Sequence, residues 1–186
     1  MRASEVRNVE ELRALLSQGG AVRYLCFWGH RAALGRISKT CLSQWYPAPF
    51  DIDGTRYPTA EHFMMAEKAR LFGDTELREQ ILKAADPAAA KAYGRKVRHF
   101  EGDVWEKHRF DIVVRASVGK FGANQDLKGF LLATGDTVLV EASPVDSIWG
   151  IGLAADHADA QNPIAWRGLN LLGFALMEAR ARLLSQ

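Results

Sequence analysis

The chain has 186 residues, of which 48% are hydrophobic and 25% charged, and its formal net charge is +2. This length allows one domain with a substantial core, and the composition is ordinary for a globular protein. No run of basic residues concentrates the small positive charge, which argues against electrostatic binding to nucleic acid or a membrane surface. No apolar run approaches the ~20 residues of a membrane span, so no membrane partner is expected.

Cysteine and histidine spacing argues against a metal site. The cysteines, Cys26 and Cys41, do not form a Cys-x-x-Cys pair, and no two histidines have the i,i+4 spacing that binds zinc on a helix. With no secretory signal at the start of the sequence, the two cysteines predict free thiols in a reducing cytoplasm. Gly150-Ile-Gly152 lacks the residues that complete a nucleotide-binding loop, so no such cofactor is expected either.

The first third of the chain predicts a helix, a strand and a hairpin. Asn8 followed by Glu11 is typical of a helix start, and Gly19-Gly20 marks the end of that helix. Residues 22–28 are rich in β-branched and aromatic side chains and predict a strand. Asp53-Gly54, between short apolar runs, predicts a two-residue hairpin turn because both positions tolerate positive φ.

The rest of the chain is predominantly helical in pattern. Pro58 and Thr59 predict the start of a helix that continues to Arg70. Further helices are expected over about 74–84, 87–94, 103–118, 124–132 and 169–184, with a strand over 137–140. We therefore predict a predominantly α-helical α+β single domain with two or three short strands and no βαβ rhythm. Residues 1–20 are expected to form an N-terminal packing helix, and residues 21–186 the functional domain.

The helix after Thr59 carries the most informative pair of charges. Glu61 and Lys68 are seven residues apart, which places them within ~20° of one another and about 10 Å apart along the axis. Met64 and Met65 lie on or beside the same face. A carboxylate and an ammonium on an apolar helix face are more typical of a site than of a core. The alternative is a surface Glu and Lys that flank a methionine core stripe. His62 points ~100° away and is expected to be a packing residue.

Carboxylates and one lysine are the candidate catalytic groups, since no Gly-x-Ser-x-Gly motif is present. Glu61 and Asp146, which lies in a Pro- and Gly-rich loop, form the most plausible acid and base pair. Glu141 and Asp51 are competitors, although each is also typical of a solvated turn or cap. Lys68, with a pKa lowered by the neighbouring methionines, could attack a sugar carbon as a neutral amine.

Cationic and aromatic side chains supply candidate substrate contacts. Arg31, Arg95, Arg109 and Lys120 are candidates to hold a phosphate, with surface ion pairs as the alternative for each. Five tryptophans exceed what one small core needs, and flat faces on loops suit a planar heterocycle. The alternative is that all five fill the core. They are Trp28, Trp45, Trp105, Trp149 and Trp166.

A series of motifs, in order from about Tyr24 to Arg182, resembles the NADAR family of YbiA-like N-glycosidases. The motifs are Phe27-Trp-Gly-His, Leu42-Ser-Gln-Trp-Tyr-Pro-Ala-Pro-Phe50, Asp53-Gly-Thr-Arg-Tyr-Pro-Thr-Ala-Glu-His62, Ala66-Glu-Lys-Ala69, Asp86-Pro87 with Gly94-Arg95, Trp105 with Arg109, Lys120-Phe121, Leu132-Ala-Thr-Gly135, Val140-Glu-Ala-Ser143, Asp146-Ser-Ile-Trp-Gly-Ile-Gly152 and Asn170-Leu-Leu-Gly173. Any one of them alone is a weak signal, but their shared order makes coincidence a poor explanation.

The resemblance implies a YbiA-like fold and a hydrolase that cleaves a C–N bond at a ribose carbon without metal or redox cofactor. In the family, YbiA-like members cleave ribosylamino-pyrimidine phosphates of riboflavin synthesis, and a lysine imine with the sugar has been proposed. Carried over by position, the family's residues fall on Glu61, Lys68, Trp105, Asp146 and Trp149. The predicted catalytic residues are Glu61, Lys68 and Asp146, and the predicted substrate-binding residues are Trp28, Arg31, Trp105, Arg109, Lys120 and Trp149.

One departure from the family pattern leaves the substrate open. This chain reads Phe63-Met-Met-Ala-Glu-Lys68 where many YbiA-like proteins read Tyr-Phe-Gln-Ala-Gln-Lys, so Met65 replaces a Gln amide that can bond to substrate. The expected partner is a small ribosyl-phosphate molecule. The alternatives are removal of ADP-ribose from guanine bases in nucleic acid, as other family members do, and a non-catalytic module that binds ADP-ribose or a nucleotide. The presence of Glu61, Lys68 and Asp146 favours an enzyme.

Overall fold

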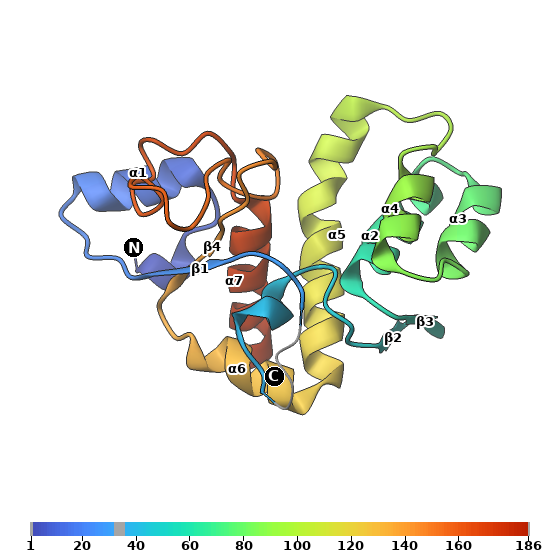
Figure 1. Ribbon diagram of the computed structural model, residues 1–186, viewed down its shortest axis with the longest axis horizontal. Helices are drawn as coiled ribbons and strands as arrows, with labels where there is room; N and C mark the ends of the chain where they lie inside the picture. Colours follow the sequence, from blue (N-terminus) through green and yellow to red (C-terminus); the bar gives the residue numbers. More distant parts are fainter. Residues whose placement is uncertain (1, 32–35, 186) are drawn as a thin grey trace. The chain divides into compact units, whose positions relative to one another are not determined.

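A computed structural model describes residues 2–31 and 36–185 of the chain. The chain divides into two compact units, here called the first unit (Met1–Ser43 and Asp126–Gln186) and the second unit (Gln44–Gln125). Helices dominate both units, and the strands are short (Figure 1). The predicted α+β class is confirmed. Among the described residues, no helix combines the length and apolar character needed to cross a bilayer.

The first unit combines a two-stranded parallel sheet with helices. Strand β1 (Tyr24–Phe27) pairs with β4 (Val138–Glu141), and Leu25 lies opposite Leu139. The parallel pairing joins strands that the sequence patterns identified separately without indicating that they meet. The helical elements of this unit are η1 (Ala3–Glu5), α1 (Val9–Ser17), η2 (Lys39–Leu42), α6 (Gln125–Ala133) and α7 (Leu171–Leu184).

Helix α7 packs closely on strand β4, and two residues at its start explain how. A Cβ atom at Gly173 would lie 2.1 Å from the carbonyl oxygen of Leu139, so only glycine allows this approach. Asn170, in the left-handed region at φ 52°, accepts a hydrogen bond from the Glu141 N–H at 2.9 Å. Its amide also donates to the Leu139 carbonyl at 2.9 Å. The Asn-x-x-Gly pattern therefore joins helix and sheet.

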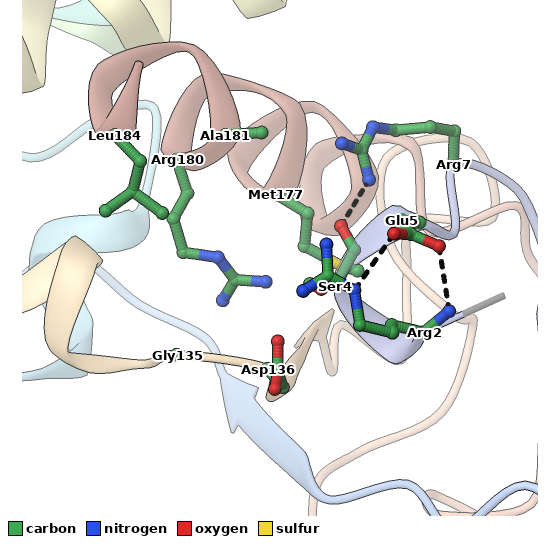
Figure 2. Close-up of a pocket in the computed structure, with 10 residues that line it drawn as sticks. All are labelled: Arg2, Ser4, Glu5, Arg7, Gly135, Asp136, Met177, Arg180, Ala181 and Leu184. Carbon is green, nitrogen blue, oxygen red and sulfur yellow. Dashed lines mark hydrogen bonds and ion pairs between the residues drawn. The ribbon is translucent and has the colours of Figure 1, made fainter. Parts of the chain in front are cut away.

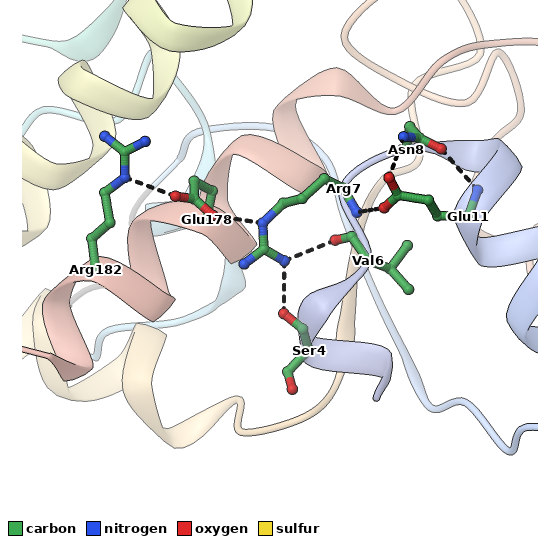
Figure 3. Close-up of polar contacts among 7 residues, drawn as sticks. All are labelled: Ser4, Val6, Arg7, Asn8, Glu11, Glu178 and Arg182. Atoms are coloured by element: carbon green, nitrogen blue, oxygen red, sulfur yellow. Dashed lines mark hydrogen bonds and ion pairs between the residues drawn. The ribbon is translucent and has the colours of Figure 1, made fainter. Parts of the chain in front are cut away.

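The N-terminal segment is tied to α7 by one arginine. Arg7 donates to Glu178 at 2.6 Å and to the Ser4 and Val6 carbonyls at 2.7 and 2.9 Å (Figure 3). Helix α1, with Asn8 accepting from the Glu11 N–H as predicted, then buries an apolar face. The proposed division into a packing helix over 1–20 and a domain over 21–186 stays a prediction.

The second unit begins with the predicted hairpin. Strands β2 (Phe50–Ile52) and β3 (Thr55–Tyr57) are antiparallel, and Asp53 and Gly54 between them have φ of 50° and 74°. Four helices follow: α2 (Ala60–Leu71), α3 (Thr75–Leu82), α4 (Pro87–Gly94) and α5 (Gly102–Ala123). The Thr59 side chain accepts a first-turn N–H of α2, as predicted, and the side chains of Asp74 and Asp86 do the same at the starts of α3 and α4.

Two expectations about these elements were wrong. The described residues hold four strands rather than two or three. Helix α5 continues to Ala123 rather than ending near 118. Gly119 lies inside this helix, where a Cβ would come within 2.9 Å of Phe50 and Ile52. This glycine allows α5 to approach β2 and is not a helix stop.

Candidate functional site

Helix α2 holds the central pair of charged residues of the second unit. Thr59 caps the helix, and the backbone N–H of Glu61 donates to the Gln44 carbonyl at 3.0 Å. The Glu61 side chain is almost fully buried, with the residue only 2% exposed, whereas Lys68 is half-buried. The helix packs against α3, α4 and α5, which accounts for burial on nearly every side. The carboxylate therefore lies in surroundings far drier than bulk water.

Lys68 is held by a carbonyl and two aromatic rings. Its Nζ donates to the Gly94 carbonyl at 2.9 Å and lies 4.3 Å from the ring centroid of Phe100 and 5.7 Å from that of Trp105. The carbonyl and the ring faces fix the position of the nitrogen. Burial lowers the pKa of Lys68 from its ordinary value. The direction agrees with the prediction, but the groups in contact with the nitrogen are a carbonyl and two aromatic rings.

Close packing of α4 on α2 brings the Gly94 carbonyl within reach. A Cβ at Gly94 would lie 2.1 Å from the sulfur of Met65, so a larger residue would require the Met65 side chain or the helix to shift. Met65 stands where many family members have glutamine, and its side chain fills this contact between helices. The residue thus has a packing role in this chain.

His62 is a packing residue, as its direction on the helix predicted. Its ring bonds to the Thr59 hydroxyl at 2.8 Å and to the Ala84 carbonyl at 3.2 Å. Burial lowers the pKa of His62, so the neutral ring is favoured. These contacts join the start of α2 to the end of α3 and leave the imidazole no evident catalytic task.

Three predicted substrate-binding residues lie along one side of α5. At ~100° per residue, Trp105, Arg109 and Lys120 fall within a sector of ~60°. Arg109 is 9% exposed and lies 3.6 Å from Glu106, and Lys120 is 1% exposed. The Nζ of Lys120 is 5.6 Å from the ring centroid of Tyr46 and 5.0 Å from that of Phe121. Trp105 and Lys68 meet directly.

The first unit holds the loop of Asp146 and Trp149. One oxygen of Asp146 accepts the N–H groups of Ile148 and Trp149, at 2.9 and 2.8 Å. The Trp149 carbonyl in turn accepts the N–H of Leu172 at the start of α7 at 3.1 Å. The loop is therefore fixed at both sides, and the carboxylate of Asp146 shapes it.

The remaining candidates differ in their surroundings. Trp28 and Arg31 follow β1 and are exposed, Trp28 at 56%. Asp51 lies in β2, rather than in a turn or cap, and forms a surface ion pair with Arg56 at 2.9 Å. Arg95 is exposed. Trp166 is buried and donates to the Ala160 carbonyl at 3.0 Å, which is the structural role of a core tryptophan.

Sequence reasoning missed Phe100, although its ring is the nearest aromatic contact of the Lys68 nitrogen. Phe100 is 46% exposed and packs edge-on against Phe72, with centroids 5.2 Å apart. It lies in the segment between α4 and α5, outside every periodic pattern, so only its aromatic character could have suggested a role. Among the described residues, no group of three or more His, Cys, Asp or Glu side chains could hold a metal ion.

The second unit therefore defines a class: a small α+β protein with a buried carboxylate and a half-buried, ring-bound lysine on one helix. The chain belongs to the NADAR family, because the NADAR domain model matches residues 26–184. The resemblance identified from the motifs is confirmed.

Named relatives agree with this assignment. The chain is 42% identical over 163 residues to N-glycosidase R617 of Acanthamoeba polyphaga mimivirus, covering 85% of this chain and 95% of that protein. It is 34% identical over 142 residues to riboflavin biosynthesis protein VVA0006 of Vibrio vulnificus, covering 76% of this chain but 35% of that protein. The NMR structure of YbiA from E. coli aligns with a TM-score of 0.68 and 26% identity, over 99% and 92% of the two chains. The predicted class, a hydrolase of N-glycosyl bonds, is confirmed at the level of the family.

Proposed function

We propose that this protein hydrolyses the C–N glycosidic bond of ribosylamino-pyrimidine phosphates, the reactive early intermediates of riboflavin synthesis. The observation that carries the proposal is Lys68, held by the Gly94 carbonyl at 2.9 Å beside Trp105, on the same side of α2 as the buried Glu61. Relatives named N-glycosidase support the bond that is cleaved, and the relative named for riboflavin biosynthesis supports the substrate class.

Hydrolysis at an anomeric carbon passes through a state with positive charge on the sugar ring. The departing nitrogen takes the electron pair of the broken C–N bond and needs a proton, and water supplies the new oxygen. Glu61 is the acid and base that gives this proton and later takes one from water. Asp146 has the proposed task of stabilising the cationic sugar. Its bonds to two N–H groups of its own loop hold the carboxylate in one position.

Lys68 has two alternative tasks. As a neutral amine, favoured by its lowered pKa, it attacks the aldehyde-level carbon of the opened sugar, forms an imine and releases the aminopyrimidine; water then hydrolyses the imine. As an ammonium, it holds a ribose oxygen or the phosphate instead. Trapping with borohydride separates the two, because only the imine becomes a stable secondary amine on Lys68.

The other substrate contacts follow from side-chain chemistry. Trp105 and Trp149 are assigned to the planar base and Trp28 to a further stacking contact. Arg31, Arg109 and Lys120 are assigned to the phosphate. A cytoplasmic location is proposed on the substrate class.

The test compares two substrates with one enzyme preparation. Release of ribose 5-phosphate from 5-amino-6-ribosylaminouracil 5′-phosphate is measured beside release of ADP-ribose from an oligonucleotide with ADP-ribosylated guanine. We expect turnover of the first. Turnover of only the second would assign the protein to nucleic acids, and turnover of neither would favour a binding module.

Glu61→Gln keeps the shape of the side chain and removes its charge. We expect turnover to fall by ~10²–10⁴, the range of general acid and base catalysis. Glu101→Gln, at an exposed position before α5, is the matched control and should leave turnover unchanged. A loss of less than about tenfold in Glu61→Gln would count against the assigned role.

A further inference from the structure

Arg180 is a buried cation in the first unit that the proposed reaction does not use. The residue lies in α7 and is 2% exposed. Its Nη1 donates to the Thr134 hydroxyl at 2.6 Å and to the Thr137 carbonyl at 3.0 Å. Its Nη2 is buried and, within residues 2–31 and 36–185, has no hydrogen-bond partner. A buried donor without an acceptor is unfavourable, which makes this atom unusual.

A cavity of about 320 Å³ lies beside this guanidinium. Met177, Ala181 and Leu184 of α7 form an apolar part of its lining, and Asp136 also lines it. Figure 2 shows the Arg180 side chain leaving α7 and extending toward Asp136 and the N-terminal residues. The volume falls at the lower end of the ~300–1,000 Å³ of small-molecule sites.

The other arginines that line this cavity already have acidic partners. Arg2 forms an ion pair with Glu5 at 2.9 Å. Arg7 is held by Glu178 at 2.6 Å and by two carbonyls (Figure 3). Arg180 has no carboxylate within ion-pair distance among the described residues. The charge available to a ligand in this cavity is therefore that of Arg180.

The balance of charges around Arg180 keeps the guanidinium cationic at neutral pH. Burial, with a smaller contribution from Arg7, lowers its pKa to about 10, while Asp136 acts in the opposite direction. Asp136 is exposed, and its carboxylate forms no hydrogen bond or ion pair within the described part of the chain. It attracts the guanidinium from a distance but leaves the Nη2 donor unbonded.

We propose that this pocket binds a small organic anion whose carboxylate or phosphate oxygen accepts a hydrogen bond from Nη2 of Arg180. The carbon part of the ligand packs against Met177, Ala181 and Leu184. An oxyanion is the natural acceptor for a guanidinium, and the apolar part of the lining favours an organic anion over an inorganic one. None of the residues that line this pocket is assigned to hydrolysis, so binding can be measured without the reaction.

The first experiment titrates the unmodified protein with butyrate and, separately, with propyl phosphate at constant ionic strength, with chloride as reference. The side-chain Nε–H NMR signal of Arg180 and the thermal midpoint are followed. We expect a saturable shift of that signal and a rise in midpoint that chloride does not produce, since a ligand that binds only the folded state stabilises it. The better of the two anions identifies the acceptor group. A non-saturating response that equals chloride would overturn the proposal.

Three variants locate the binding. Ala181→Leu fills the cavity without touching the bonds of Arg180, and we expect it to abolish the saturable shift. Asp136→Asn removes a repulsive charge and should tighten binding several-fold. Arg180→Lys keeps the charge but loses the planar donor set, and a folded variant should bind at least tenfold more weakly. Unchanged affinity in Ala181→Leu would place any observed binding elsewhere and contradict the assignment.

Discussion

The start of helix α3 and the end of helix α2 hold charged side chains in opposite ways. At the start of α3, the buried carboxylate of Asp74 accepts four hydrogen bonds, from the Leu77 N–H and from three nitrogens of Arg98 at 2.5–3.0 Å. These bonds hold the pKa of Asp74 well below its usual range and raise that of Arg98. Every lone pair that the carboxylate offers is in use.

At the end of α2, Lys68 has a carbonyl and two ring faces, and no carboxylate within ion-pair distance in the described residues. Its charge is desolvated without being neutralised, so the pKa moves toward the neutral amine. A charged group whose hydrogen-bonding positions are all occupied stabilises a fold. A charged group with fewer partners remains available for chemistry. The comparison predicts that Asp74 affects stability and Lys68 affects activity.

The largest expected effect is on turnover. Lys68→Met removes the amine and keeps much of the side-chain volume, so we expect turnover to fall by about 10³-fold if the lysine is covalent. The thermal midpoint should stay level or rise, because a desolvated amine is removed from its half-buried site. Lys96→Met, at an exposed lysine 5.7 Å from the ring of Tyr93, is the matched control. Turnover within tenfold of the unmodified enzyme would contradict the covalent role.

The pH dependence of turnover tests the same amine. An attacking lysine must be neutral, so the rate should rise with pH and level off above the pKa of Lys68. Because burial lowers this pKa, the midpoint of the rise should lie below the ordinary lysine value. The measurement is the rate of a single turnover over a pH series. A rate that falls as pH increases through this range would instead favour an ammonium that holds the substrate.

The next largest effect is expected on the stability of the fold and concerns Asp74, which has no assigned role in the reaction. Asp74→Asn removes a carboxylate whose pKa is depressed in the folded state, so we expect the largest fall in unfolding midpoint among these variants. The stabilisation is present above the unfolded pKa of ~3.9 and is lost as pH falls through the folded value. Urea unfolding at pH 7 and pH 3 should therefore show a difference between the two proteins that shrinks in acid. Glu76→Gln, an exposed second partner of Arg98 at 3.1 Å, should change stability little.

Asp146 can be tested by two substitutions that separate charge from loop geometry. Asn at this position keeps an oxygen that accepts the Ile148 and Trp149 N–H groups, whereas Ala keeps none. If Asp146 stabilises the cationic sugar, Asp146→Asn lowers turnover by about 10²-fold with an unchanged midpoint. Asp146→Ala should lower both. Full activity in the Asn variant would assign the carboxylate to the loop alone.

Local signals account for what could be predicted of the fold. The caps at Asn8, Thr59 and Asp74 and the Asp53-Gly54 turn act within a few residues, so they can be recognised in the sequence alone. The continuation of α5 past 118 could not be predicted in this way, because Gly119 lies against Phe50 and Ile52 of β2, which are distant in the sequence. The pairing of β1 with β4 joins residues more than a hundred positions apart, for which no local pattern exists.

In the candidate site too, local features could be predicted from the sequence, whereas contacts between distant segments could not. Helical periodicity placed Glu61 and Lys68 on one side of α2, but the groups that hold Lys68 come from the end of α4 and from the segment after it. Neither the Gly94 carbonyl nor the Phe100 ring has a sequence signal, since one is backbone and the other lies outside any period. The roles of Asp146, Trp149, Trp28 and Arg31 stay predictions from the resemblance and from side-chain chemistry.

The smallest expected effect concerns Phe100, because its substitution alters the surroundings of Lys68 without removing the amine. Phe100→Leu removes a ring whose centroid lies 4.3 Å from the nitrogen, and Phe100→Tyr keeps it. A cation–π contact at a partly exposed site is worth ~0.5–1 kcal/mol, which corresponds to a factor of about two to five in rate if the ring positions the amine. We expect steady-state kinetics to show a fall in kcat by that factor in the Leu variant. The Tyr variant should have the kcat of the unmodified enzyme. Equal kcat values in both variants would show that Gly94 and Trp105 suffice to position the lysine, and a loss that appears only in KM would make Phe100 a substrate contact.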